Sequence, residues 1–270
     1  MENSIKKYNI LKNYVNYKNV IIENMKGFNQ SNPVDIFSKH KKRIFSQMGE
    51  DGIIEFIFSI VKPKHEYFVE FGAWDGEHLS NTANLRINKG WNGLLLEGDE
   101  EKVLSLPNKE KLNLRCELVS KNNINNIFLK YNVPKDFDFL SIDIDSNDYH
   151  VWAGLTKFRP TLVVVEINTG IKNELPLTII ENQSRVNIKT KFSNYFGANL
   201  HAFYNLATKK GYKLLTVEKW NAFFIINEEF DKFSIDTINK KEMLNKYCVF
   251  DKYWADRNKC PKNLLWKIAK

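Results

Sequence analysis

The 270-residue chain lacks several features that would assign it to a class at once. It has three cysteines, Cys116, Cys248 and Cys260, and no CxxC pair. This scarcity excludes a cysteine zinc site and suits free thiols in a reducing compartment. No stretch approaches the roughly 18 consecutive apolar residues that span a bilayer, and the first residues show no apolar core of a signal peptide. We therefore expect a cytoplasmic protein without a membrane span.

Acidic residues are outnumbered, 32 against 40 basic ones, which gives a formal net charge of +8. An excess of positive charge favours encounter with anionic partners. The basic residues are scattered, however, and the densest run, KHKKR at 39–43, is typical of a solvated face. The charge therefore gives little support to nucleic-acid binding.

Two periodicities alternate from about residue 66 onward. Short runs of β-branched and aromatic residues are separated by segments with helical spacing, which indicates a parallel sheet covered by helices on both faces. Two further strands, KLLTV and NAFFII, extend the sheet to seven strands in a Rossmann-like α/β fold. The earlier expected strands are 67–71, 93–97, 114–119, 137–143 and 161–167, and the expected helices between them are 77–89, 99–106, 122–131 and 147–156.

The same pattern divides the chain into three parts. We predict an N-terminal helical extension (1–45), an α/β domain (46–228) and a C-terminal helical tail (229–270) packed on that domain. Within the domain, a helix should precede the first strand over 46–61, and a second should end near Gly211. Residues 169–196 have no periodicity, which suggests a long loop or lid. The extension and the tail are open to two roles, a homodimer contact or a wall of an acceptor site.

The turn after the first strand reads VEFGAWDG and lacks the glycine that a dinucleotide fingerprint requires. In GxGxxG the second glycine lets a pyrophosphate approach the backbone. Trp74 occupies that place, which counts against NAD and against an NAD-dependent oxidoreductase. Glu70, Gly72 and Gly76 suit a cofactor without phosphates, although a plain tight turn would read the same way.

The second strand ends in Glu97, within WNGLLLEGD. A carboxylate at this strand end can accept two hydrogen bonds from a ribose diol, as in nucleotide sites of this architecture. The alternative is an ordinary surface acid at the end of a strand.

Motifs along the chain carry a resemblance to a known family. Together they resemble the FkbM-type S-adenosylmethionine-dependent methyltransferases of class I over roughly residues 44–227, including a bacterial branch with GEDG before the first strand. The resemblance implies a Rossmann-like fold, S-adenosylmethionine as methyl donor, and O-methylation, often of sugars or natural-product hydroxyls. The motifs are SQMGEDG, FVEFGAWDGEHLSNTANL, WNGLLLEGD, FLSIDIDSNDYHVW and TLVVVEIN.

The resemblance also implies roles for individual residues. Glu70, Gly72 and Gly76 would surround the methionine part of the cofactor, and Glu97 would bind its ribose. Ser120 would lie near the adenine, and Asp143 would face the cofactor amino group. The remaining residues that we assign to the cofactor site are Gln47, Asp75, Asn81 and Gly98, and Glu50 and Asp51 are expected to close over it with Gln47.

Polar residues gather where the fourth and fifth strands end. His150 or an aspartate, Asp143 or Asp145, is a candidate general base for removing a hydroxyl proton. Alternatively, Asp145 or Asp143, together with Glu166 and Asn168, would hold Mg²⁺, a hard cation that prefers oxygen ligands. In a third interpretation Asp145 caps the next helix and Asp148 lies in its first turn. The family's motif resembles D-x-E-G-x-E, whereas this chain has no glycine there, which leaves the role of Asp148 open.

The sequence thus predicts an S-adenosylmethionine-dependent O-methyltransferase. The expected acceptor is a hydroxyl of a small molecule or saccharide, for instance a precursor of a bacterial surface polysaccharide, with or without a phosphate. An RNA methyltransferase ranks lower, because the loop after the fifth strand has basic residues only towards its end. A non-catalytic partner subunit of the same fold is a further alternative, but such a subunit has little reason to keep the acidic residues.

Overall fold

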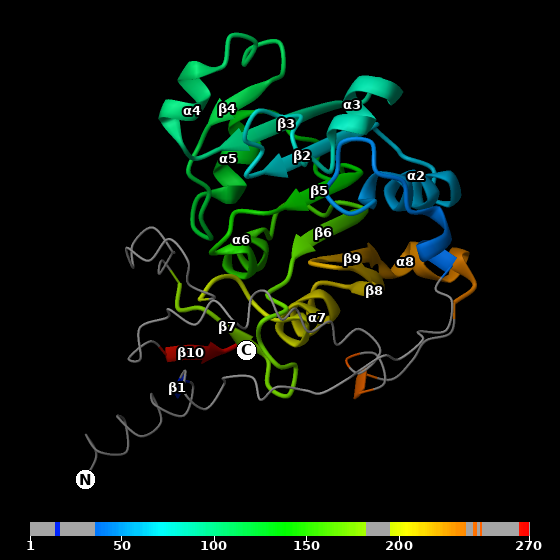
Figure 1. The fold of residues 1–270 in the computed structure, drawn as a ribbon, viewed down its shortest axis with the longest axis vertical. Helices are drawn as coiled ribbons and strands as arrows, with labels where there is room; N and C mark the ends of the chain where they lie inside the picture. Colours follow the sequence, from blue (N-terminus) through cyan, green and yellow to red (C-terminus); the bar gives the residue numbers. More distant parts are fainter. Residues whose placement is uncertain are drawn as a thin grey trace.

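The fold is seen in a computed structural model, which describes residues 14–16, 36–181, 195–235, 240–241, 244 and 265–269. Its centre is a seven-stranded sheet in the order β4-β3-β2-β5-β6-β9-β8 (Figure 1). The first five are parallel, whereas β9 runs antiparallel to both β6 and β8. This confirms the predicted Rossmann-like sheet and the pairing of its two late strands. The strands are β2 (Tyr67–Phe71), β3 (Asn92–Glu97), β4 (Leu114–Cys116), β5 (Phe139–Ile142), β6 (Leu162–Glu166), β8 (Tyr212–Glu218) and β9 (Asn221–Ile226).

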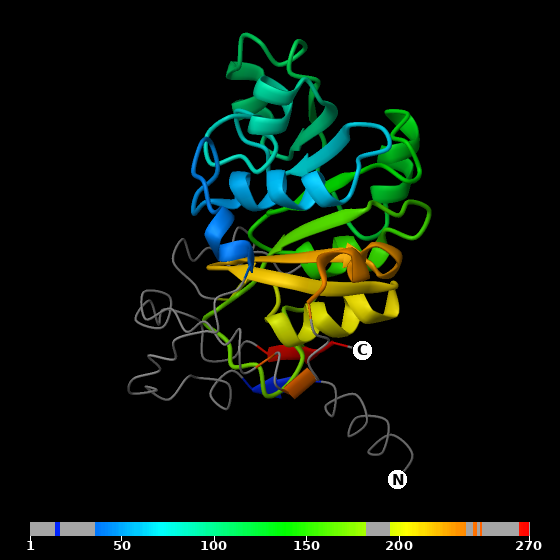
Figure 2. The same cartoon turned by 90° about the vertical axis from the view of Figure 1, so that its right-hand side faces the viewer.

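Helices cover both faces of the sheet (Figures 1 and 2). Side chains alternate along each strand, so Phe68 packs with the cluster that contains α2 and α3, whereas Val69 packs with α5, α6 and α7. Both clusters are buried, which explains why the central strands read as continuous apolar runs. The helices are η2 (Ile36–His40), α2 (Glu50–Ile60), α3 (Ala83–Lys89), α4 (Glu100–Ser105), α5 (Ile124–Lys130), α6 (Asp148–Gly154), α7 (Leu200–Lys209), α8 (Asn227–Phe230) and η3 (Asp231–Phe233).

A second, smaller sheet joins three distant parts of the chain. Its strands β1 (Tyr14–Asn16), β10 (Leu265–Ile268) and β7 (Leu177–Thr178) are antiparallel and lie below the large sheet in Figure 1. The helix predicted for 1–45 is therefore wrong at β1, and the helical tail predicted for 229–270 is wrong at β10. Most of both segments lies outside the described residues.

Several predicted elements begin later than expected for a local reason. The helix predicted over 77–89 starts at Ala83, because the residues before it are hydrogen-bonded to Glu70. The helix predicted over 46–61 starts at Glu50, since the preceding turn is held by Asp51. Gly211, with φ +80°, follows the end of α7 as predicted.

The stretch predicted as a loop, 169–196, contains β7, and its residues 182–194 lie outside the described part. Among the described residues, no helix is long and apolar enough to cross a membrane.

Candidate active site

The candidate site lies at the carboxyl edge of the parallel strands, where the order of the strands reverses between β2 and β5. In open α/β sheets ligands bind at such a switch point. Gly72 follows β2 there with φ +68°, and a Cβ atom on it would lie 1.8 Å from the carbonyl oxygen of Asp143. Only glycine allows the loops after β2 and β5 to approach this closely.

Glu70 is a buried carboxylate that organises the loop after its own strand. It accepts hydrogen bonds from Ser80 Oγ (2.7 Å), Thr82 Oγ1 (2.6 Å) and the backbone N–H of Asn81 (2.9 Å). Burial raises the pKa of Glu70, and these hydrogen bonds act in the opposite direction. Asn81 also donates from Nδ2 to Ser141 Oγ, which links this loop to β5. Glu70 and Asn81 therefore shape the loop from inside.

The tip of the same loop is exposed and partly strained. Trp74 has φ +48°, unusual for a bulky residue, and 46% of its surface is exposed. Asp75 accepts from the backbone N–H groups of Glu77 and His78 at 2.9 and 2.7 Å. Gly76, with φ +76°, packs so closely on β3 that a Cβ would lie 2.7 Å from Leu95 Cδ1.

Glu97 connects the end of β3 to this loop. Its Oε2 accepts from the backbone N–H of Trp74 and its Oε1 from that of Asp99, both at 3.0 Å. A carboxylate has about four acceptor positions, so Glu97 keeps capacity for a further donor. Gly98 follows and is exposed. Ser120 lies after β4, where its N–H donates to Asn123 Oδ1 at 2.7 Å.

Three carboxylates lie close together at the carboxyl ends of β5 and β6. Asp143, Asp145 and Glu166 each place an oxygen within 4.8 Å of the other two, and both aspartates are exposed. Asp145 has φ +57°, a conformation that aspartate tolerates better than most residues. We call this group the acidic cluster. It contains both aspartates predicted as alternatives for the first metal ligand, together with the predicted ligand Glu166.

Asn168, the third predicted ligand, has its amide engaged in the loop that follows β6. Oδ1 accepts from the backbone N–H of Gly170 and Nδ2 donates to the carbonyl of Phe196, both at 2.9 Å. The side chain is 1% exposed. Its observed contacts hold loop backbone.

Asp148 and His150 are buried on α6. Asp148 lies in the first turn and accepts from the backbone N–H groups of Ile144 (2.8 Å) and Ser146 (2.9 Å), while burial raises its pKa to about 6. His150 Nε2 lies 2.9 Å from the carbonyl oxygen of Ile179, which fixes Nε2 as the donor. Burial lowers the pKa of His150. Asp148 thus holds the turn that carries Asp145, and the observed contact of His150 is structural.

Two acids of the GEDG motif before β2 hold neighbouring backbone through hydrogen bonds that the sequence did not predict. One oxygen of Asp51 accepts from the N–H groups of residues 44–46 and from Ser46 Oγ, at 2.7–2.8 Å. Glu50 accepts from Met48 N–H and from Asn221 Nδ2. Ser46 forms a bridge with Leu79, so the half-buried Gln47 lies beside the loop after β2. In the sequence, the signal for these contacts is a pair of adjacent acids, Glu50 and Asp51, at the start of a predicted helix.

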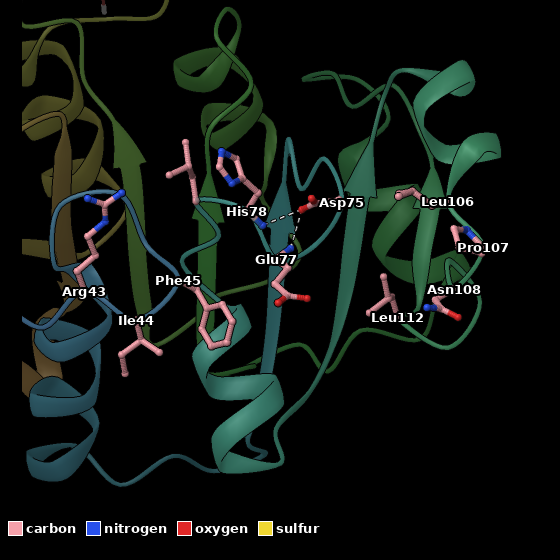
Figure 3. Close-up of a pocket in the computed structure, with 11 residues that line it drawn as sticks. Arg43, Ile44, Phe45, Asp75, Glu77, His78, Leu106, Pro107, Asn108 and Leu112 are labelled. Carbon is pink, nitrogen blue, oxygen red and sulfur yellow. Dashed lines mark hydrogen bonds between the residues drawn. The ribbon is translucent and has the colours of Figure 1, made fainter.

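A cavity of about 530 Å³ opens between three segments (Figure 3). They are residues 43–45 before α2, residues 75–79 after β2, and residues 106–112 between α4 and β4. Among the residues predicted to bind the cofactor, Asp75 lines this cavity.

Comparison with known proteins gives similarity of structure alone. No protein-family model and no curated protein matches the chain. A methyltransferase dependent on S-adenosylmethionine from Clostridium acetobutylicum shares 12% identity and a TM-score of 0.39, covering 66% of this chain and 90% of its own. A second such methyltransferase, from Aquifex aeolicus, shares 10% identity and a TM-score of 0.36, covering 66% of this chain and 90% of its own. An O-methyltransferase from Bacillus cereus shares 16% identity and a TM-score of 0.35, covering 65% of this chain and 88% of its own.

The strand order itself defines the class of fold. Five parallel strands are followed by an antiparallel pair, and β9, the later of that pair in the sequence, is inserted between β6 and β8; this is the order of the class I methyltransferase sheet. A fold of this kind hosts many functions, so the function must be argued from the site.

Proposed function

We propose that the protein is an S-adenosylmethionine-dependent methyltransferase that modifies a hydroxyl group of a small molecule or saccharide. The observation that carries the proposal is the position of Glu97. It ends β3 at the carboxyl edge and accepts a hydrogen bond from Trp74 in the loop at the switch point. A ribose-binding acid of this architecture lies at this strand end.

The residues present suit this cofactor better than a dinucleotide. Glu97 has acceptor capacity left for a ribose diol. The bulk of Trp74 stands where a pyrophosphate would need bare backbone. We assign Glu97 and Gly98 to the ribose, Ser120 to the adenine, and the loop from Gly72 to Gly76 with Asp143 to the methionine part. The cofactor would supply a methyl group on a sulfonium centre.

The acidic cluster is the proposed place of proton removal. A carboxylate there accepts the proton that the acceptor hydroxyl loses, and a fixed orientation of that hydroxyl lowers the barrier further. The three carboxylates also suit Mg²⁺ as hard oxygen ligands, and the ion would lower the pKa of a bound hydroxyl. Asp148 and Asn168 would then be positioning residues, because they hold the loops that carry the cluster.

Calorimetric titration tests the cofactor assignment. Wild-type protein should bind S-adenosylhomocysteine with micromolar affinity and should not bind NAD⁺. Glu97→Gln should weaken the binding at least tenfold, because it removes the charge that a ribose diol would contact, worth about 1.5–3 kcal/mol. Glu101→Gln, an exposed acid on α4, is the matched control and should bind normally. If the wild type does not bind S-adenosylhomocysteine, the proposal is wrong.

A further inference from the structure

Asn221, the first residue of β9, carries a buried amide oxygen that the contacts described so far do not use. The side chain is 5% exposed, and its Nδ2 donates to Glu50 Oε1 at 2.8 Å. Because an ionised carboxylate only accepts, this contact fixes which end of the amide is the nitrogen. Among the residues that the structure describes, none donates a hydrogen bond to Asn221 Oδ1. A buried oxygen left unsatisfied costs about 1–3 kcal/mol, so this atom is expected to meet a donor or a cation.

A second buried asparagine shows how both ends of such an amide are satisfied elsewhere in the protein. Asn84 donates from Nδ2 to Glu55 Oε1, also at 2.8 Å and also on α2. Its Oδ1 accepts from Asn88 Nδ2 at 2.9 Å. The two asparagines make the same contact with α2 and differ only at the amide oxygen. Asn84 is therefore an internal reference for Asn221.

The register of the sheet places Asn221 beside the acidic cluster. Asn221 is paired with Glu166, the member of the cluster on β6, so both side chains leave the same face of the sheet. In the next pair along, Ile167 N–H donates to the carbonyl of Trp220. Glu166 and Asn221 thus form a non-hydrogen-bonded pair, in which side chains come closest. With Cβ atoms about 4.5–5.5 Å apart in such a pair, the amide oxygen can reach an ion that the cluster holds.

The surroundings favour a cation at this oxygen. The three carboxylates of the acidic cluster each have an oxygen within 4.8 Å of the other two, and oxygens around one octahedral Mg²⁺ lie about 3–4 Å apart. An amide oxygen adds a ligand to such a site without adding negative charge. We propose that Asn221 Oδ1 is a fourth oxygen ligand of a Mg²⁺ ion held by the acidic cluster, with its amide oriented by Glu50. This role rests on the metal-binding role of the cluster in the proposed function and does not depend on S-adenosylmethionine.

Calorimetric titration of the full chain with MgCl₂ tests this ligand. The wild type should bind one Mg²⁺ per chain, and Asn221→Ala should weaken the binding at least about tenfold, the lower end of the loss typical for a residue of a metal site. Asn84→Ala breaks the matching contact with α2 and should leave the affinity unchanged. Equal affinities of the wild type and Asn221→Ala, as expected if water satisfies the amide oxygen, would overturn the inference, and so would no binding by the wild type.

Asn221→Asp provides a second test that does not depend on the alanine variant being stable. Its carboxylate has the shape of the amide and still offers an oxygen ligand, so this variant should bind Mg²⁺. The ion should also raise its melting temperature more than that of the wild type, because it neutralises a carboxylate that otherwise faces Glu50. An equal or smaller rise would contradict the inference.

Titration with S-adenosylhomocysteine separates this inference from the proposed cofactor. Asn221 is assigned no contact with the cofactor, so Asn221→Asp should bind S-adenosylhomocysteine as the wild type does. A wild type that binds Mg²⁺ through Asn221 but does not bind S-adenosylhomocysteine would refute the proposed function and support the ligand role of Asn221.

Discussion

The loops after β2 and after β5 are each held by a buried acid, but the acid precedes the first loop and follows the second. In the first, Glu70 lies in the strand and accepts from the loop that follows; in the second, Asp148 lies in the helix and accepts from the loop that precedes. Both acids are buried. Among the acids that remain accessible, Glu97 lies beside the first loop, and Asp143 and Asp145 lie in the second. Burial and backbone hydrogen bonds thus separate acids that build loops from acids that can meet a ligand.

The largest effect should come from the contact between the two loops. Gly72→Ala places a Cβ 1.8 Å from the carbonyl oxygen of Asp143 at φ +68°, so we expect a loss of about 4 kcal/mol in the free energy of unfolding, measured by urea denaturation. Gly90→Ala is the control. Gly90 has φ +74° but no atom within 4 Å of its Cβ position, so strain alone should cost about 1 kcal/mol. Equal losses would show that the close approach is unimportant.

The buried Asp148 should make the stability of the protein depend on pH. Burial raises the pKa of Asp148 from 3.8 to about 6, so the folded state binds more protons than the unfolded state between these values. The contribution of Asp148 to stability is therefore fully present below pH about 4 and is lost as the pH rises through about 6, by roughly 3 kcal/mol. The difference in unfolding free energy between wild type and Asp148→Asn should change by that amount across this window. A constant difference would contradict the assignment.

The same substitution should affect stability much more at Glu70 than at Glu97. Glu70→Gln leaves buried donors poorly matched and should cost about 2 kcal/mol of unfolding free energy. Glu97→Gln, in a half-buried position, should change stability by no more than about 0.5 kcal/mol. Thermal unfolding monitored by circular dichroism measures both. A larger loss for Glu97→Gln would mean that Glu97 is also a structural acid.

Sequence reasoning located the core of the sheet well because its signals are local. The apolar run at 67–71 coincides with β2, the run at 161–167 contains β6, and the alternation of strands and helices predicted layers on both faces. Glu97 and the acids after β5 were predicted as site residues because the carboxyl ends of parallel strands meet at one edge. These features depend on residue type at short range.

What the sequence did not predict depends on distant contacts. The strands β1 and β10 form by pairing with each other across most of the chain, and β7 has only two residues, Leu177 and Thr178. The amide of Asn168 could be a ligand or a loop contact, and the choice rests on Phe196 and Gly170. The hydrogen bond from His150 to Ile179 is equally non-local.

The smallest effect should come from the acidic cluster. Asp145→Asn removes one of three neighbouring negative charges, and asparagine tolerates φ +57°, so stability should rise by about 0.5 kcal/mol or less. Millimolar Mg²⁺ should raise the melting temperature of the wild type and leave that of Asp145→Asn unchanged, as measured by differential scanning calorimetry. Equal responses would remove the cluster as a metal site.

The most direct test of the account is a crystal structure of the protein grown with S-adenosylhomocysteine. We expect the ribose hydroxyls within hydrogen-bonding distance of the Glu97 carboxylate, and the methionine part beside Gly72 at the switch point between β2 and β5. Density for the ligand at any other place, with Glu97 still bound only to Trp74 and Asp99, would contradict the central claim.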